Sequence, residues 1–439
     1  MIPVDLIIEA RWVLPVVPRG LVLDHAAVVI RDGRIIDLQP IAEARQRFEA
    51  ARVTSLPDQA LIPGLINLHT HAAMSLMRGL ADDTPLMVWL NQHIWPAETG
   101  VLSERFVRDG TLLACAEMLR GGVTCFNDMY FFPQAAGEAV AQAGLRACLG
   151  LVTLEFATPY AADADDYLHK GLAARDALRG HDRITTCLAP HAPYTVSDRT
   201  FARIITYAEQ LGLNIHMHLH ETRDEIAQSE SQYGLRPLSR LAQIGLLGPN
   251  LLAAHAVHLT ETEIDLLATC GCHVMHCPGS NLKLGSGIAP VSKMLEAGIN
   301  VGLGSDGAAS NNRLDIWSEM RLAALLAKAQ GEPDSLPARQ VLEMATINAA
   351  RALALEHEIG SIEPGKWADL VAVDFSEAEM QPCYDPVSHL VYVAGREQVS
   401  HTWVAGELRY QRGVFQSVEQ DQVKEIAALW QGKLKPFKR

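Results

Sequence analysis

Two histidines separated by one residue, His69 and His71, end the apolar run LIPGLINLHTH and are the first residues that indicate chemistry. In a β-strand, residues two apart point to the same side, so both imidazoles can face one cavity. The chain has 17 histidines in 439 residues, and about one such pair is expected by chance. The pair therefore gains meaning only if other parts of the chain supply partners.

Candidate partners follow other apolar runs. They are His216, His218, His220, Glu221, His255 and Asp306. Imidazole nitrogens with a carboxylate oxygen form a typical ligand set for Zn²⁺ or a similar divalent ion. A single strand histidine is more often an interior residue, and Asp306 alone could cap a helix. The repeated placement of these residue types where apolar runs end favours a metal site.

The elements that must position these residues lie between residues 62 and 360, where short apolar runs alternate with helical patterns. Eight runs read as strands: 64–71, 122–128, 145–154, 184–195, 214–222, 250–259, 272–278 and 300–307. This alternation predicts an α/β fold, a (β/α)8 TIM-type barrel, with a doubly wound open sheet as the alternative. In such barrels catalytic residues lie at the carboxyl ends of strands. The candidate ligands follow the first, fifth, sixth and eighth runs.

The two ends of the chain differ from the middle. Residues 4–60 and the segments 366–374 and 399–415 alternate apolar and polar residues around turn signals. Distant terminal strands can pair into one unit. We predict a small β-sandwich domain from residues 1–61 plus 361–439, beside a barrel domain over residues 62–360. The tail resembles an amphipathic helix with a basic end, and the sequence leaves open whether it packs on the sandwich or on a neighbouring subunit.

The composition excludes several classes of function. A net charge of −14 argues against nucleic acid or an anionic membrane as a partner. No run of about 18 uncharged apolar residues predicts a membrane span, and the amino-terminal segment lacks the features of a secretory signal. The eight cysteines form no Cys-x-x-Cys motif and are expected to be reduced. We expect a cytoplasmic protein.

Together these segments resemble the amidohydrolase superfamily, and within it the nucleoside-type deaminases, over nearly the whole length. The segment PGLINLHTHAAMSLMRGL resembles the first-strand metal motif of this superfamily, and HLHET resembles its fifth-strand His-x-x-Glu motif. The segments HCPGSNLKLGSGIAPV and GLGSDGAASNNRLDIWSEMRLAALLAK resemble the part of the superfamily sequence that carries the metal-binding aspartate. The return into the small sandwich resembles TINAARALALEHEIGSIEPGKWADLVAVD. The deaminases of 5′-methylthioadenosine and S-adenosylhomocysteine are the most similar group.

The resemblance implies a hydrolytic deaminase that converts 5′-methylthioadenosine, and also adenosine and S-adenosylhomocysteine, to the inosine analogue and ammonia. It implies one divalent metal ion, with Zn²⁺ expected, held by His69, His71, His218 and Asp306. His218 fits because Glu221 follows it by three residues. The fourth-strand lysine that bridges two metals in some relatives is absent from CLAPHAPYT. A small-molecule nucleoside is the expected partner, and a homo-oligomer would be usual.

The same resemblance implies catalytic roles for three residues. Glu221 would donate a proton to ring N1 of adenine, and Asp306 would accept the proton of the attacking water. His255 would hydrogen-bond that water or the developing oxygen. General acid–base help of this kind is worth about 10²–10⁴ in rate. Glu221 could instead pair with Arg223 or serve as an acid at a helix N-terminus.

Three further residues are implied on the substrate side. Glu98 would accept hydrogen bonds from the ribose cis-diol, and its alternative is a solvated loop acid. His191 would reach the ribose or its 5′ side, or be an interior histidine. Trp89 would cover the adenine or the 5′ group. Equally, it could be an ordinary core residue of a helix. No arginine lies between Arg146 and Arg175, which predicts a preference for a neutral methylthio group over a charged homocysteine tail.

Other functions share these motifs. A guanine, 8-oxoguanine or cytosine-type deaminase, or a triazine hydrolase, would use the same metal site. A barrel that had lost its ligands could act as a binding scaffold without catalysis, but the complete ligand set speaks against that reading.

Overall fold

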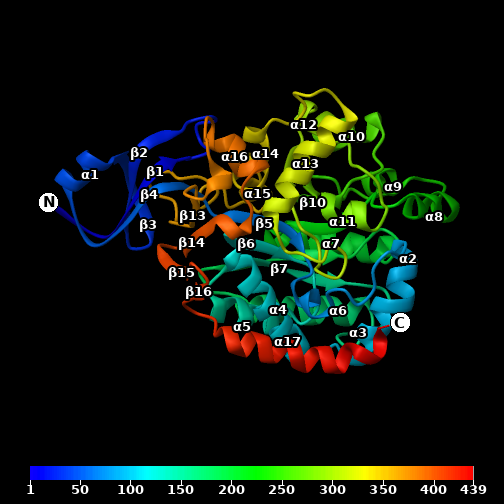
Figure 1. The fold of residues 1–439 in the computed structure, drawn as a ribbon. Coiled ribbons are helices and arrows are strands. Elements are labelled where there is room, and N and C mark those ends of the chain that lie inside the picture. The colour runs from blue at the N-terminus through cyan, green and yellow to red at the C-terminus, as the bar shows by residue number, and fades with distance from the viewer. Residues whose placement is uncertain (439) are drawn as a thin grey trace.

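The computed structural model describes residues 1–438, which form two eight-stranded sheets (Figure 1). The first sheet is parallel, and its strands follow one another in chain order. The strands are β5 (Leu65–Thr70), β6 (Val123–Asp128), β7 (Arg146–Thr153), β8 (Ile184–Pro190), β9 (Ile215–Leu219), β10 (Leu251–His255), β11 (His273–His276) and β12 (Asn300–Leu303). Nearly all their residues are buried, as expected for strands covered on both faces.

Hydrogen bonds join the segment directly after the last strand to the first strand and close the barrel. The Asp306 backbone N–H donates to the His69 carbonyl over 2.9 Å, and the Thr70 hydroxyl donates to the Asp306 carbonyl over 3.0 Å. The Ser305 N–H donates to the Asn67 side chain over 2.9 Å. The predicted barrel is therefore confirmed, and the open-sheet alternative is excluded.

Helices surround the barrel and follow its strands. They are α4 (Glu104–Arg120), α5 (Pro133–Ala143), α6 (Ala164–Leu178), α7 (Asp198–Leu211), α8 (Arg223–Tyr233), α9 (Pro237–Gln243), α10 (Glu261–Thr269), α11 (Pro278–Lys283), α12 (Val291–Glu296), α13 (Ile316–Gln330), α14 (Ala338–Met344) and α15 (Ile347–Ala352). Side-chain caps begin several of them, and Thr222 accepts the Glu225 N–H at the start of α8. Between β5 and α4 the chain forms α2 (Leu86–Trp89), a π-helical turn (η2, Leu90–Ile94) and α3 (Trp95–Val101).

The second sheet combines both ends of the chain. Its order is β16-β15-β14-β13-β4-β1-β2-β3. The strands are β1 (Ile2–Val13), β2 (Leu23–Arg31), β3 (Arg34–Pro40), β4 (Phe48–Pro63), β13 (Leu370–Asp374), β14 (Val399–Val404), β15 (Glu407–Gln411) and β16 (Val414–Phe415). Helices α1 (Ile41–Arg47) and α16 (Pro386–Tyr392) are inserted between strands. The distant ends pair where β13 lies antiparallel to β4.

The sheet curves until its amino-terminal hairpin meets the carboxyl-terminal part. The Ile35 N–H donates to the Lys366 carbonyl, and the Ala368 N–H donates to the Gly33 carbonyl, each over 2.9 Å. Buried side chains from both ends fill the space inside: Ile8, Val28, Leu61, Leu370 and Trp403 are among them. The predicted small sandwich from both chain ends is confirmed, as one curved sheet. The predicted boundary after residue 61 falls within β4 and stays a prediction.

The carboxyl-terminal helix α17 (Gln420–Leu434) packs mainly on the barrel helix α4. Figure 1 shows it running past α4 towards α3. The Trp430 indole N–H donates to the Asp109 carboxylate over 2.9 Å, and the Trp430 and Phe106 rings meet edge to face at 5.1 Å. The packing partner that the sequence left open is thus identified.

All eight cysteines are free, as expected. Within residues 1–438, none of the helices combines the length and the apolar character needed to cross a bilayer.

Candidate metal centre and active site

A cavity opens at the carboxyl ends of the barrel strands. Eight of the residues singled out in the sequence line it: His71, Trp89, Glu98, His191, His218, Glu221, His255 and Asp306. The ninth, His69, is fully buried beneath them. The remaining wall is mainly apolar and aromatic. The structure therefore brings all nine residues to one place, although hundreds of residues separate them in the chain.

Four of these side chains converge on one point. The His71 Nε2 atom lies 3.3 Å from His218 Nε2 and 3.2 Å from Asp306 Oδ1. The His69 Nε2 atom lies 3.4 Å from the same carboxylate oxygen. Ligand atoms held about 2.0–2.1 Å from a tetrahedral zinc ion lie about 3.3 Å from one another. The spacing therefore fits a single ion of this size.

Hydrogen bonds on the far side of each ring fix which nitrogen is free. The His71 Nδ1–H donates to the Met129 carbonyl over 2.6 Å, and the His218 Nδ1–H donates to the His191 carbonyl over 2.8 Å. Because a carbonyl can only accept, both rings present a lone pair at Nε2 when neutral. The His69 Nδ1 atom is 2.7 Å from His216 Nε2, while its buried Nε2 has no hydrogen-bond partner within residues 1–438. An unpartnered nitrogen aimed at this point is what a metal ligand requires.

The Asp306 carboxylate is held firmly in its ionised form. Its Oδ2 accepts from the Ser280 hydroxyl over 2.6 Å and from the Ser310 hydroxyl over 2.8 Å. Burial would raise the pKa of Asp306, but the neighbouring His69 and His71 hold it well below its ordinary value. The residue has a left-handed backbone with φ of 59°, a strained conformation that is found most often at functional sites.

The electrostatics of the cluster favour one positive charge. Burial lowers the pKa of His69 to about 4 and that of His218 well below its ordinary value, so both rings are neutral at pH 7. Burial also acts to lower the pKa of His71, but the Asp306 carboxylate outweighs it and raises the pKa to about 9. The Asp306 carboxylate therefore stabilises a positive charge at His71.

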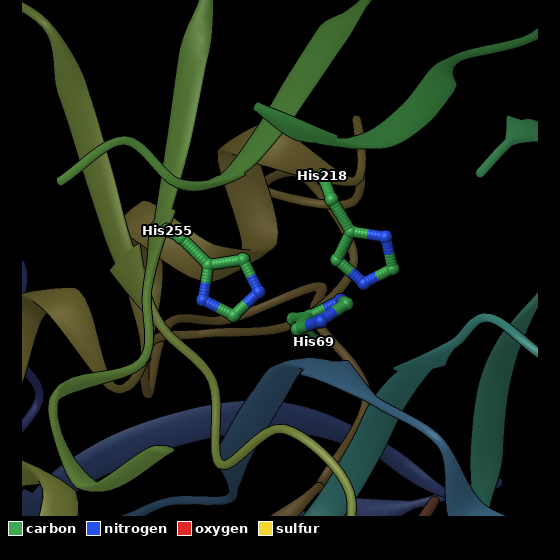
Figure 2. A group of neighbouring side chains, drawn as sticks. All are labelled: His69, His218 and His255. Carbon is green, nitrogen blue, oxygen red and sulfur yellow. The ribbon is translucent and has the colours of Figure 1, made fainter. Parts of the chain in front are cut away.

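His255 lies at the edge of this cluster. Figure 2 shows His69, His218 and His255 with their rings turned towards a common space, and one nitrogen of each lies within 4.8 Å of the others. The His255 Nδ1 atom is 2.8 Å from the Asn281 amide oxygen, which leaves Nε2 facing the cavity. That Nε2 lies 3.7 Å from the Glu221 carboxylate. His255 thus connects the metal-binding cluster to Glu221.

Glu221 lies in the turn between β9 and α8. The Glu225 carboxylate clamps this turn, since it accepts the backbone N–H groups of His220 over 2.9 Å and of Glu221 over 2.8 Å. Burial raises the pKa of Glu221, although His255 opposes the shift. Among the described residues no ion pair joins Glu221 to Arg223. The side chain is therefore free to act on a molecule in the cavity.

Glu98 reaches the cavity from α3. The Tyr130 hydroxyl donates to its carboxylate over 2.7 Å. Burial raises the pKa of Glu98 to about 7. The solvated-loop alternative is wrong, because only 9% of Glu98 is exposed.

Replacing Glu98 by Gln is expected to lower activity and raise stability together. Ionisation of Glu98 opposes folding as the pH rises from its ordinary pKa of 4.5 to about 7. The neutral amide removes this cost, which reaches up to about 3 kcal/mol at pH 8. Thermal unfolding at pH 5 and pH 8 checks this: the melting temperature of E98Q should exceed that of the wild type by clearly more at pH 8 than at pH 5. Equal melting temperatures at pH 8 would contradict the shift.

His191 and Trp89 both line the cavity. The His191 ring centroid is 4.7 Å from that of His218, and burial lowers its pKa to about 3, so it contacts the cavity as a neutral ring. Trp89 ends α2 and lines the cavity, and its buried indole Nε1 has no partner within residues 1–438. Trp89 is thus both helix core and cavity wall.

Several supporting residues escaped the sequence analysis. They are Tyr130, Ser280, Asn281, Ser310 and Glu225, together with the orienting role of His216. Each acts through one or two hydrogen bonds to predicted residues, and no spacing rule separates such a serine or tyrosine from an ordinary surface residue. His220 turns away, and its Nε2 accepts the Leu238 N–H over 3.0 Å.

Comparison with known proteins gives a consistent result. Residues 60–409 match the Amidohydrolase family. The 5-methylthioadenosine/S-adenosylhomocysteine deaminase of Saccharophagus degradans is 48% identical over 433 residues, which cover 98% of this chain and 97% of that protein. The deaminase of the same name from Teredinibacter turnerae is 46% identical, with 98% of each chain covered. The crystal structure of an adenosine deaminase from Xanthomonas campestris with bound zinc has a TM-score of 0.97 and 47% identity, and the match covers 99% of both chains.

Proposed function

The chain belongs to the amidohydrolase family, and on this premise we propose that it is a metal-dependent deaminase. Its substrate would be 5′-methylthioadenosine or a related adenosine nucleoside, which it would convert to the inosine analogue and ammonia. The observation that carries this proposal is the convergence of His69, His71, His218 and Asp306 beside two buried carboxyl groups, Glu221 and Glu98.

The metal would be held by His69, His71, His218 and Asp306. The spacing of 3.2–3.4 Å between these ligand atoms and the unpartnered His69 Nε2 support this set. His255 lies at the edge and contacts Glu221 instead. When bound, such an ion supplies an activated water nucleophile and an electrostatic sink for negative charge.

The residues of the chain itself would manage the protons. Glu221, with its raised pKa, is suited to donate a proton to ring N1 of adenine, which makes C6 easier to attack. Asp306 stays ionised and can accept a proton from the attacking water. His255 can hydrogen-bond the oxygen that develops on C6, because its Nε2 faces the cavity beside Glu221.

The nucleoside sugar would lie towards Glu98 and His191. A carboxylate can accept two hydrogen bonds from a cis-diol, and the Tyr130 hydroxyl fixes its direction. A deaminase of free bases would have no use for this buried acid. The Glu98–Tyr130 pair therefore favours a nucleoside over guanine, cytosine or a triazine.

The 5′ end of the substrate would meet an apolar wall. Val152 near the end of β7 and Leu154 and Phe156 just after it line the cavity, and no lysine or arginine of residues 1–438 does. The acids that follow β7 have partners outside the cavity. Asp165 pairs with Arg203, Asp166 pairs with Lys170, and Glu155 accepts the Ser197 N–H. A preference for a neutral 5′ group would thus come from the apolar wall. Repulsion between the acids after β7 and a charged 5′ tail would contribute little.

We expect kcat/KM for 5′-methylthioadenosine to exceed that for S-adenosylhomocysteine by about tenfold or more, because the charged homocysteine tail would lose water without gaining a partner. Steady-state rates for both substrates with the same metal-loaded preparation measure this ratio. A ratio below one would contradict the assignment of the 5′ wall.

A panel of candidate substrates tests the proposed function itself. Ammonia release is measured with 5′-methylthioadenosine, adenosine, S-adenosylhomocysteine, guanine and cytosine. The proposal predicts fast release from the adenosine nucleosides alone. Faster release from guanine or cytosine would support a base deaminase, and no release from any compound by the metal-loaded protein would support a binding scaffold.

A further inference from the structure

The carboxyl-terminal segment contacts the back of the helix that carries Glu98. After α17, a short 3-10 turn (η5, Lys435–Phe437) ends beside Gly100 of α3. A Cβ atom at Gly100 would lie 2.3 Å from the Phe437 ring, and all three of its nearest neighbours would be atoms of that ring. The Phe437 side chain therefore occupies the space that only a glycine at position 100 leaves open.

Glu98 and Gly100 face opposite directions on α3. Residues two apart on an α-helix are separated by about 200° around its axis. Glu98 faces the cavity, so Gly100 faces away from it. The Phe437 ring thus presses on one side of the helix while the Glu98 carboxylate acts on the other.

Helix α3 depends on contacts of this kind for its position. It forms the last seven residues of a continuous helical segment over residues 86–101, and an isolated helix of that length is only marginally stable in water. Two contacts hold it on the cavity side, the Tyr130 bond to Glu98 and the contact between the Trp95 and Phe156 rings at 5.8 Å. Phe437 supplies a contact from behind.

The segment that delivers Phe437 is firmly anchored. Trp430 and Leu434 of α17 are each 3% exposed, and the indole of Trp430 is bonded to Asp109 of α4. Helix α4 follows α3 directly in the chain. The anchor and the helix that it supports therefore belong to one packed unit.

We propose that Phe437 is a positioning residue that holds α3, and with it the Glu98 carboxylate, against the substrate cavity. The inference rests on the proposed function, because it takes Glu98 as the contact of the ribose hydroxyls. The carboxyl-terminal helix would then serve substrate binding without touching the substrate.

The test compares F437A, G100A and the double variant with the wild type. Each single substitution is expected to raise KM for adenosine about 3- to 10-fold, with kcat changed less than about twofold, because a small shift of α3 misplaces Glu98 but leaves the reacting groups in place. In the double variant the added methyl group has room, so its KM should rise less than the product of the two single effects. Independent, multiplying effects would overturn the proposal.

Two controls separate positioning from general damage. L429A changes a side chain on α17 that is 39% exposed, and it should leave KM unaltered. The analogue 2′,3′-dideoxyadenosine lacks the hydroxyls that Glu98 would bind, so its kcat/KM should be the same in F437A and the wild type. An equal loss for adenosine and the analogue, or an unaltered KM for adenosine in F437A, would overturn the proposal. A metal-loaded wild type that deaminates no nucleoside would refute the proposed function instead, and a thermal-unfolding cycle of the same variants would then decide whether Phe437 and Gly100 are coupled.

Discussion

Replacing His71 by Ala is expected to abolish metal binding and to lower kcat/KM by at least about 10³-fold. His71 Nε2 lies between His218 Nε2 at 3.3 Å and Asp306 Oδ1 at 3.2 Å, so its removal leaves a gap in the ligand set. It also removes one of the two partners, beside His69, that keep the Asp306 pKa low. Metal analysis of the purified variant, together with its rate on adenosine, measures both effects.

A second buried histidine provides the control. His276 lies at the carboxyl end of β11, is 2% exposed and does not line the cavity. H276N should therefore retain the metal and most of the activity. If H71A kept a full equivalent of metal and near-normal rates, the proposed ligand set would be wrong. Loss of metal from H276N but not from H71A would contradict it equally.

Replacing Glu221 by Gln is expected to lower kcat by about 10²–10⁴ while the metal stays bound. The amide keeps the size of the side chain but cannot deliver a proton to ring N1. Because the backbone N–H of Glu221 is held by Glu225, the turn should keep its shape. Steady-state kinetics with a parallel metal assay separate this loss from a loss of the ion.

The pH dependence gives an independent check on Glu221. Burial raises the pKa of this acid, so its protonated form persists to higher pH than in an ordinary glutamate. A proton donor works in the protonated form, and kcat should therefore fall as the pH rises through that pKa. E221Q should lack this alkaline fall. An E221Q variant within about tenfold of the wild-type kcat, with the same pH profile, would assign the proton transfer to another residue.

The barrel was predictable because its signals are local. Each strand is a short apolar run, and the histidines and acids that follow those runs mark the carboxyl ends where barrels place their sites. The run 300–307 illustrates this, since β12 ends at Leu303 and Asp306 follows it. The small sandwich was predictable in kind, because alternating strands recur at both ends. That it is one curved sheet depends on long-range pairs such as β4 with β13, which no local pattern encodes.

The supporting residues were not predictable, for a physical reason. The Tyr130 bond to Glu98 and the Ser280 bond to Asp306 depend on where two distant loops meet. The packing of α17 depends on the hydrogen bond between Trp430 and Asp109, which are 321 residues apart in the chain. Such contacts form only once the barrel has folded. The types of the ligand residues and their order along the chain, by contrast, can be seen in the sequence. The predicted homo-oligomer stays a prediction.

The most direct measurement is a crystal structure of the zinc-loaded protein with anomalous data at the zinc edge. The account predicts one ion per chain, bonded to Nε2 of His69, His71 and His218 and to Oδ1 of Asp306 at about 2.0–2.2 Å, with Glu221 and His255 facing the open side. An ion held by His255 in place of His71 or Asp306, or no ion at this point, would contradict it.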